Sequence, residues 1–468
     1  MKPLASVTLA LALALAACAA GPGDLPTASD VTLPEAFAFA DDAAAEAAVA
    51  DLLPDDPAFH LLARSSLARS PTLGAALARI DIARAGAARA GAQRRPSIGY
   101  GAGVSATRTN PDQFGADLPA GVDFDTERAA YSADLTARWD PDLFGALRAS
   151  ERAATARLDA ASADAAAVRL ALIAEIGGAV IDWRTLDARE AALEEDLESA
   201  NAIARLAGVR EDAGIAPGAD RYRAEAQAAA SRSRIAALTS ERARIIGRLV
   251  ALTALPVDEI RAALAVDTAH SGLPVAPAAL PSTLLHARPD IVAASYRLAA
   301  ADADVAAAAA QRFPRLDLSA GIGLLAFALG DLFEADSIIG NVAAGIAGPL
   351  LDFGRIEAQI DAAEGQTLLA FEQYRGAVFA ALGETESAYA LIAATDAQAA
   401  AAADEAAMAS RAARLAETRY RAGLENFLSA LEARRVADAS GDRAAAARGR
   451  AQRARILLWQ SLGGSDLD

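Results

Sequence analysis

Four segments of the chain alternate between apolar residues and polar or glycine residues with a period of two, which predicts β-strands. In the first segment, Ile98, Tyr100 and Val104 alternate with serine and glycine. Each segment is long enough to cross a bilayer as a tilted strand, which takes roughly 9–11 residues. The alternation suits lipid on one face and water on the other, although a soluble sheet on a core would alternate in the same way. The predicted strands lie near residues 97–106, 128–140, 315–325 and 338–350.

Two very long helices are predicted, because no proline interrupts Arg148 to Val209 or Arg355 to Arg421. At ~1.5 Å per residue they would measure roughly 90 and 100 Å, far more than a globular domain requires. Each ends near a glycine, Gly214 or Gly423, and a second helical stretch follows. We therefore expect two long antiparallel helical hairpins, whose return helices run from Gly218 to Ala254 and from Leu424 to Leu462.

The chain contains two copies of one pattern. Pro71 and Pro289 are 218 residues apart, and so are Pro96 and Pro314. Further along, the glycines that end the motifs Asp142–Gly145 and Leu351–Gly354, and those that end Arg210–Gly214 and Arg419–Gly423, are 209 residues apart. Two constant offsets joined by one step indicate a tandem repeat, with nine extra residues in the first copy around Thr107 to Arg128. The predicted repeats are residues 58–275 and 276–468.

The first 17 residues have the features of a signal peptide. Lys2 supplies the positive charge, and the apolar run from Leu4 to Ala17 is too short to span a bilayer. The run Leu15-Ala16-Ala17-Cys18 resembles the bacterial lipoprotein signal, in which the cysteine carries lipid, while an ordinary signal peptide that contains a cysteine is the alternative. By the same resemblance, Ala19 in place of aspartate indicates the outer membrane. Residues 18–57 would form a lipidated linker rich in proline, glycine and aspartate.

Composition and charge argue against nucleic-acid binding and against catalysis. The chain has 61 acidic and 44 basic residues, and so acidic a surface repels phosphate backbones. Hydrophobic residues make up 54% of the chain but aromatic residues only 5%, a mixture that suits long helices packed through alanine better than an enzyme core. The histidines, His60, His270 and His286, have no metal-ligand spacing. We expect no enzyme activity, no metal and no cofactor besides the lipid on Cys18.

Four strands in one chain predict an oligomer. Helices as long as those predicted here cannot serve as the core partner of a small sheet, which favours a membrane barrel over a soluble sheet. Four strands cannot close a barrel, and an open edge in hydrocarbon leaves backbone groups unpaired at several kcal/mol each. Three copies around a threefold axis would give twelve strands, an even number within the range of bacterial barrels.

Several motifs occur in the order found in one known family. They are Trp139–Gly145, Leu280–Leu285, Ala287–Ile291, Phe313-Pro314, Pro349–Arg355 and Arg419–Leu428. The chain resembles the TolC-like outer membrane factors of tripartite efflux systems, in their lipoprotein branch. The resemblance implies an α+β fold, in which a transmembrane β-barrel continues into a long periplasmic α-helical coiled-coil barrel. It also implies a homotrimer in the outer membrane, docked to a periplasmic adaptor and an RND-type inner membrane pump.

The resemblance also implies two sets of functional residues. The family's resting constriction is lined by a leucine and, one helical turn later, an acidic residue, which match Leu428 and Glu432 here. In a trimer Glu432 would form a ring of three carboxylates that attracts cations, whereas a solvated helix charge is the alternative. The family meets its adaptor at the hairpin tips, where ordinary turn chemistry is the other interpretation. The matching tip residues are Arg210, Gly214, Arg419 and Gly423.

The function expected on these grounds is passive conduction of small molecules out of the periplasm. Two alternatives remain at this point. The same fold could serve protein or peptide secretion with a transport ATPase, since the pump partner determines the cargo. A lipid-anchored periplasmic coiled-coil protein without a pore is the other alternative.

Overall fold

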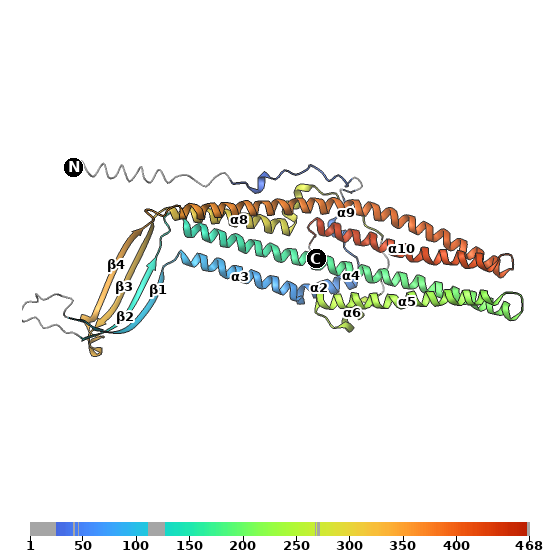
Figure 1. Cartoon of the computed structure of the whole chain (residues 1–468), viewed down its shortest axis with the longest axis horizontal. Helices are drawn as coiled ribbons and strands as arrows, with labels where there is room; N and C mark the ends of the chain where they lie inside the picture. The colour runs from blue at the N-terminus through green and yellow to red at the C-terminus, as the bar shows by residue number, and fades with distance from the viewer. Residues whose placement is uncertain are drawn as a thin grey trace, which may run out of the picture. The chain divides into compact units, whose positions relative to one another are not determined.

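A computed structural model describes residues 25–40, 43–44, 46–110, 127–266, 268 and 272–465. The predicted signal peptide, Cys18, His270 and most of the extra segment in the first repeat lie outside the described residues. None of the described helices combines the length and the apolarity needed to cross a membrane. The helices and strands (Figure 1) are α2 (Pro57–Arg69), α3 (Pro71–Gln93), β1 (Ser97–Arg108), β2 (Glu127–Trp139), α4 (Ala146–Asp212), α5 (Gly218–Thr253), α6 (Val257–Leu264), α7 (Leu284–Ala287), α8 (Pro289–Ala309), β3 (Arg315–Ala326), β4 (Ile338–Ala347), α9 (Arg355–Arg421) and α10 (Phe427–Ser461).

The chain forms two compact units, and each unit takes residues from both predicted repeats. The first unit contains Asp81–Asp159 and Tyr296–Glu372, and therefore the strands. The second unit contains Ser29–Ile80, Ala160–Ser295 and Gln373–Asp468, and therefore the helical hairpins. The long helices α4 and α9 contribute to both units. The repeats are units of sequence, and the compact units are assembled by pairing equivalent parts of the two repeats.

The four strands form one antiparallel sheet in the order β1-β2-β3-β4 (Figure 1). Each repeat contributes one hairpin, β1-β2 or β3-β4, and the pairing of β2 with β3 joins the two hairpins. Strand β4 ends at Ala347 rather than near residue 350, because Pro349 follows and a proline has no N–H to donate to the sheet. The other strands begin and end within a few residues of the predicted positions.

The two faces of the sheet differ in chemistry. One face is apolar and exposed: Tyr100 is 89% exposed and Val342 is 88% exposed. On the other face, Arg138 lies opposite Ser97 on one side and Ser319 on the other. Several glycines also lie on this polar face, namely Gly99, Gly101, Gly103, Gly321 and Gly323. The sheet therefore offers a hydrocarbon-compatible surface and a water-compatible surface, and no hydrophobic core among the described residues covers either of them.

The repeated motif before each long helix is an N-terminal cap. The backbone N–H groups of Leu147 and Arg148 donate to the carboxylate of Asp142 at 2.9 and 2.8 Å. In the second repeat, the N–H of Ile356 donates to Asp352 at 2.9 Å. A carboxylate at this position satisfies N–H groups that have no partner within the helix. The motif thus specifies where α4 and α9 begin, which explains its presence in both copies.

In the second unit, leucine packing and an arginine hold the helices together. Leu186 and Leu193, two turns apart on α4, are buried with Leu238 of α5. Arg288, which is almost fully buried, donates to Asp290 and to the carbonyl of Ser461, and it forms a 2.8 Å ion pair with Glu384 of α9. This arginine connects the start of α8 to α9 and α10. Burial alone would raise the pKa of Asp290, but the hydrogen bonds and the charge of Arg288, together with backbone N–H donors such as that of Ile291, hold that pKa below its usual value.

Candidate functional site at the hairpin tips

The two helical hairpins turn in the same way. Gly214 and Gly423 have φ of 72° and 75°, in the left-handed region that favours glycine. The N–H of Ile215 donates to the carbonyl of Arg210 at 2.9 Å, and the N–H of Leu424 donates to the carbonyl of Arg419 at 2.8 Å. The N–H groups of the two glycines also donate to carbonyls three residues earlier, those of Glu211 and Tyr420. The two kinds of hydrogen bond together form a Schellman cap at each tip. All four predicted tip residues therefore serve the turns, and their contact with an adaptor stays a prediction.

Arg210 and Arg419 differ in what their side chains contact. The Arg210 guanidinium donates to the carbonyl of Tyr420 at 2.9 Å and lies over the Tyr420 ring at 4.3 Å. Arg210 of the first hairpin therefore binds the end of α9 in the second. Arg419 forms a 3.5 Å ion pair with Glu425 in its own turn and remains half exposed. Arg210 thus joins the two tips within one protomer, whereas Arg419 is available on the surface.

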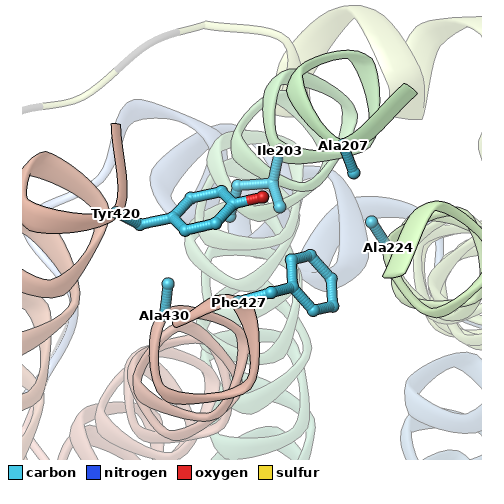
Figure 2. Close-up of a cluster of buried hydrophobic side chains, with 6 residues drawn as sticks. All are labelled: Ile203, Ala207, Ala224, Tyr420, Phe427 and Ala430. Carbon is cyan, nitrogen blue, oxygen red and sulfur yellow. The ribbon is translucent and has the colours of Figure 1, made fainter. Parts of the chain in front are cut away.

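A small apolar cluster lies beside this contact (Figure 2). The ring of Phe427, at the start of α10, packs edge-on against Tyr420 with centroids 5.9 Å apart. The Tyr420 hydroxyl is buried and has no hydrogen-bond partner among the described residues, so the tyrosine acts here mainly as an apolar ring. The cluster unites α4, α5, α9 and α10 through Ile203, Ala207, Ala224, Tyr420, Phe427 and Ala430.

The predicted aperture residues share the exposed face of α10. The helix begins after Asn426, whose side chain accepts a 2.8 Å hydrogen bond from the N–H of Ser429. Leu428 is 55% exposed, whereas the side chain of the preceding residue, Phe427, is buried. The Glu432 side chain is exposed and forms a 3.3 Å ion pair with Arg435, one turn further along. Exposed pairs contribute about 0–1 kcal/mol, so Glu432 is free to change partners.

A buried ionic cluster, which the sequence did not suggest, lies along the same helices. It is centred on Arg434, which forms ion pairs with Asp438 at 2.8 Å, Asp196 at 3.2 Å and Glu417 at 3.7 Å. The Gln227 amide also donates to Asp438 at 3.2 Å. All four charged residues are at least nine-tenths buried. The cluster connects α4, α5, α9 and α10.

This cluster has more carboxylates than cations. Burial, and then the neighbouring Asp438, raise the pKa of Asp196 to about 8, although Arg434 and Arg234 act in the opposite direction. Two carboxylates that share a buried site favour keeping one proton between them. Asp196 and Asp438 therefore favour one shared proton at neutral pH. Among the described residues, no group of three or more His, Cys, Asp or Glu could hold a metal ion.

Comparison with known proteins identifies the family. The sequence model described as Outer membrane efflux protein matches residues 62–255 and 280–464, most of the chain. The chain belongs to the outer membrane efflux protein family. It is 30% identical to the pyoverdine export outer membrane protein OpmQ of Pseudomonas aeruginosa, over 87% of this chain and 85% of that one. It is 27% identical to the solvent efflux pump outer membrane protein SrpC of Pseudomonas putida, over 81% and 79% of the two chains.

The fold agrees with solved channels of the same kind. The outer-membrane channel OprN has a TM-score of 0.83 and 27% identity, over 94% of this chain and 99% of that one. The predicted family, the α+β fold class, the outer membrane location and the function as an efflux channel are thereby confirmed. The family is one of channel and transport proteins and is not a known enzyme class.

Proposed function

We propose that three copies of this channel close a twelve-stranded barrel and conduct small molecules passively. The observation that carries the proposal is the uncovered four-stranded sheet, which has an apolar face and two open edges, β1 and β4. Unpaired backbone groups in hydrocarbon cost several kcal/mol each, and pairing β4 of one copy with β1 of the next removes them. The polar face would then line a water-filled lumen.

In this proposal the energy for transport comes from other proteins. An RND-type inner membrane pump drives export, and a periplasmic adaptor docks at the hairpin tips, near Arg210, Gly214, Arg419 and Gly423. The exposed Arg419 supports this assignment, because it is available to a partner. Lipid on Cys18 would anchor the chain to the outer membrane in addition to the barrel.

We further propose that Leu428 and Glu432 line the resting constriction. Their position on the exposed face of α10 supports this role, because only an exposed face can meet the other copies. Three Glu432 carboxylates brought together would attract cations. Arg435 lies 3.3 Å from Glu432 and offsets part of that charge, so the preference for cations depends on how Arg435 is oriented in the trimer.

Efflux of small molecules is favoured over protein secretion and over a spacer role. The relatives OpmQ and SrpC are named for pyoverdine export and solvent efflux, and both cargoes are small molecules. Their names support a similar class of cargo here. A spacer without a pore would not need a sheet with an exposed apolar face.

Conductance in planar lipid bilayers tests the pore and the constriction together. Purified wild type would be compared with Leu428→Gly and Glu432→Ala. We expect discrete channels whose conductance rises in the first variant and whose preference for cations falls in the second. A folded trimer that never conducts, even with both residues replaced, would support the spacer role.

Cysteine cross-linking tests how the barrel closes. Cysteine pairs along β1 and β4, the two edge strands, are expected to give a ladder of two and three linked chains on denaturing gels after oxidation. Cysteines on β2 provide the control, because β2 is paired on both sides within one chain. A ladder from the β2 control but none from the edges would contradict trimer closure through the strands.

A further inference from the structure

An open cavity of about 730 Å³ lies in the first unit, between the C-terminal turn of α3 and the polar ends of the strands. Three arginines line it: Arg89 on α3, Arg95 just after α3, and Arg138 on β2. We call these three residues the arginine cluster. Nothing in the proposed gating or assembly of the channel uses them.

Strand register places the cavity on the polar face of the sheet. Arg138 lies directly opposite Ser97 of β1 and Ser319 of β3, and both serines also line the cavity. The indole N–H of Trp139 donates to the carbonyl of Arg94 at 3.0 Å, which holds the end of α3 against the end of β2. The arginine cluster is therefore built on two elements that are fixed to each other.

The arginines of the cluster differ from their neighbours in having no ionic partner. Nearby, Arg312 pairs with Glu357 at 2.5 Å, and Arg94 pairs with Glu151. In the described part of the chain, by contrast, no ion pair or hydrogen bond involves the guanidinium of Arg89, Arg95 or Arg138. Guanidinium groups without an ionic partner keep all of their N–H donors available to a bound anion.

The charge of the cavity is positive overall. Two carboxylates also line it, those of Asp140 and Asp317, against three guanidinium groups. Asp140 already accepts a 2.8 Å hydrogen bond from the N–H of Asp142, so one of its carboxylate oxygens is engaged by the local backbone. A concave wall with an excess of one sign of charge concentrates counter-ions of the other sign. Guanidinium groups also bind carboxylates through paired N–H donors, which lysine does not offer.

We propose that the arginine cluster binds organic anions with several carboxylates as they pass through the channel. This inference rests on the proposed function, because the polar face lines a lumen only in a closed barrel. Three protomers would supply nine guanidinium groups to that lumen. Their charge is opposite in sign to that of the Glu432 ring, so the channel would have one constriction that admits cations and a separate site that retains anions.

Citrate block of single channels is the test. Currents would be recorded in the Leu428→Gly background, so that a closed constriction does not hide the effect, and citrate would be added on one side. We expect block at millimolar concentration, with the half-blocking concentration rising about tenfold for each arginine changed to glutamine. The reversal potential in a KCl gradient should shift toward cation selectivity in the same variants. The variants are Arg89→Gln, Arg95→Gln, Arg138→Gln and the triple variant.

Two controls separate a binding role from a loss of net charge or of folding. Arg84→Gln removes an equal charge from α3 at an arginine paired with Asp81, and it should leave the block unchanged. Arg138→Lys retains the charge but loses the paired donors, so it should weaken the block while the reversal potential stays near that of the parent channel. Neutral sucrose should block no variant selectively.

The outcomes are distinguishable. Channels that conduct normally and show the same citrate block in the parent and the triple variant would overturn the arginine cluster while leaving the proposed pore intact. An Arg84→Gln variant that weakens the block as much as Arg138→Gln would also overturn the arginine cluster and leave the pore intact. A trimer that does not conduct even with Leu428→Gly would overturn both proposals. Should the triple variant not fold, the three single variants and calorimetric titration of citrate into the detergent-solubilised trimer decide the question.

Discussion

The protonation of the buried ionic cluster can be tested with Asp196→Asn, which replaces one carboxylate oxygen by an amide nitrogen. In Asp196→Asn, the side chain retains its shape, and its remaining oxygen can still accept from Arg434, which lies 3.2 Å from Asp196 Oδ1. The new amide N–H can donate toward Asp438, as a protonated Asp196 would. The variant therefore mimics the protonated form but cannot titrate.

The sign of the expected effect follows from the raised pKa. Asp196 keeps its proton in the folded protein up to about pH 8, whereas an unfolded aspartate loses it near pH 3.9. Between these values the folded state holds a proton that the unfolded state has lost, so stability falls as the pH rises. The loss is up to about 1.4 kcal/mol for each pH unit in this window. Asp196→Asn lacks this dependence and should become more stable than wild type as the pH rises from 5 to 8.

Amide hydrogen exchange measures the pH dependence of stability around the buried ionic cluster. Peptides from α4 around Asp196 and from α10 around Arg434 would be followed between pH 5 and pH 9, and rates would be expressed as protection factors to remove the intrinsic pH dependence. Wild type should lose up to about tenfold in protection for each pH unit relative to the variant. Glu405→Gln is the matched control, because Glu405 pairs with Arg443 on the same helices but both side chains are half exposed.

Parallel protection profiles for wild type and Asp196→Asn would refute the reasoning. They would mean that Asp196 is ionised in the folded protein and that Arg434 neutralises it without a shared proton. A pH dependence lost equally in Glu405→Gln would assign the effect to general surface charge.

Three further variants, with Gly247→Ala as a control, test the turns and the packing of the second unit by thermal unfolding. Gly423→Ala should destabilise the protein by about 1 kcal/mol, because the backbone at Gly423 has a positive φ. Gly247→Ala, in open space within α5, should instead stabilise it by up to about 1 kcal/mol. Equal effects of the two substitutions would refute the turn argument. Arg288→Ala should destabilise by about 2 kcal/mol, since it removes a buried guanidinium together with its ion pairs to Asp290 and Glu384 and its hydrogen bond to the Ser461 carbonyl, and a loss below about 1 kcal/mol would show that the clamp is dispensable. Tyr420→Phe should change stability by less than about 1 kcal/mol, because the hydroxyl has no partner, and a larger loss would reveal one.

The sequence predicted the elements well because their signals are local. The alternation around Tyr100 requires only neighbouring residues, and it identified both the strands and the apolar face. The motif that ends at Gly145 and Gly354 was recognised only as part of the repeat, and its role as a helix cap became visible in the structure. The pairing of β2 with β3 could not be predicted in the same way. Register between hairpins that are far apart in sequence depends on tertiary packing rather than on local pattern.

Among the site residues, an exposed ion pair on one helix could have been predicted from the sequence, whereas the buried ionic cluster could not. Arg435 could have been found, since it lies three residues after Glu432, a spacing that pairs charges on a helix. The buried cluster could not. Arg434 and Asp438 are four residues apart in an alanine-rich helix, the same spacing as a solvated surface pair. Only the approach of Asp196 and Glu417 from other helices buries them.

The polar face of the sheet carries glycines among its charged and hydroxyl side chains, and two of these glycines are not closely packed. At Gly99, a β-carbon would meet no atom within 4 Å, and at Gly103 the nearest is the Ser132 hydroxyl oxygen at 3.5 Å. Larger residues therefore fit at both positions without disturbing the strand. In a threefold assembly, each such substitution would add three side chains to the bore at one level. The size of cargo that passes could thus be adjusted in small steps, by single substitutions that alter neither the lipid-facing surface nor the strand pairing.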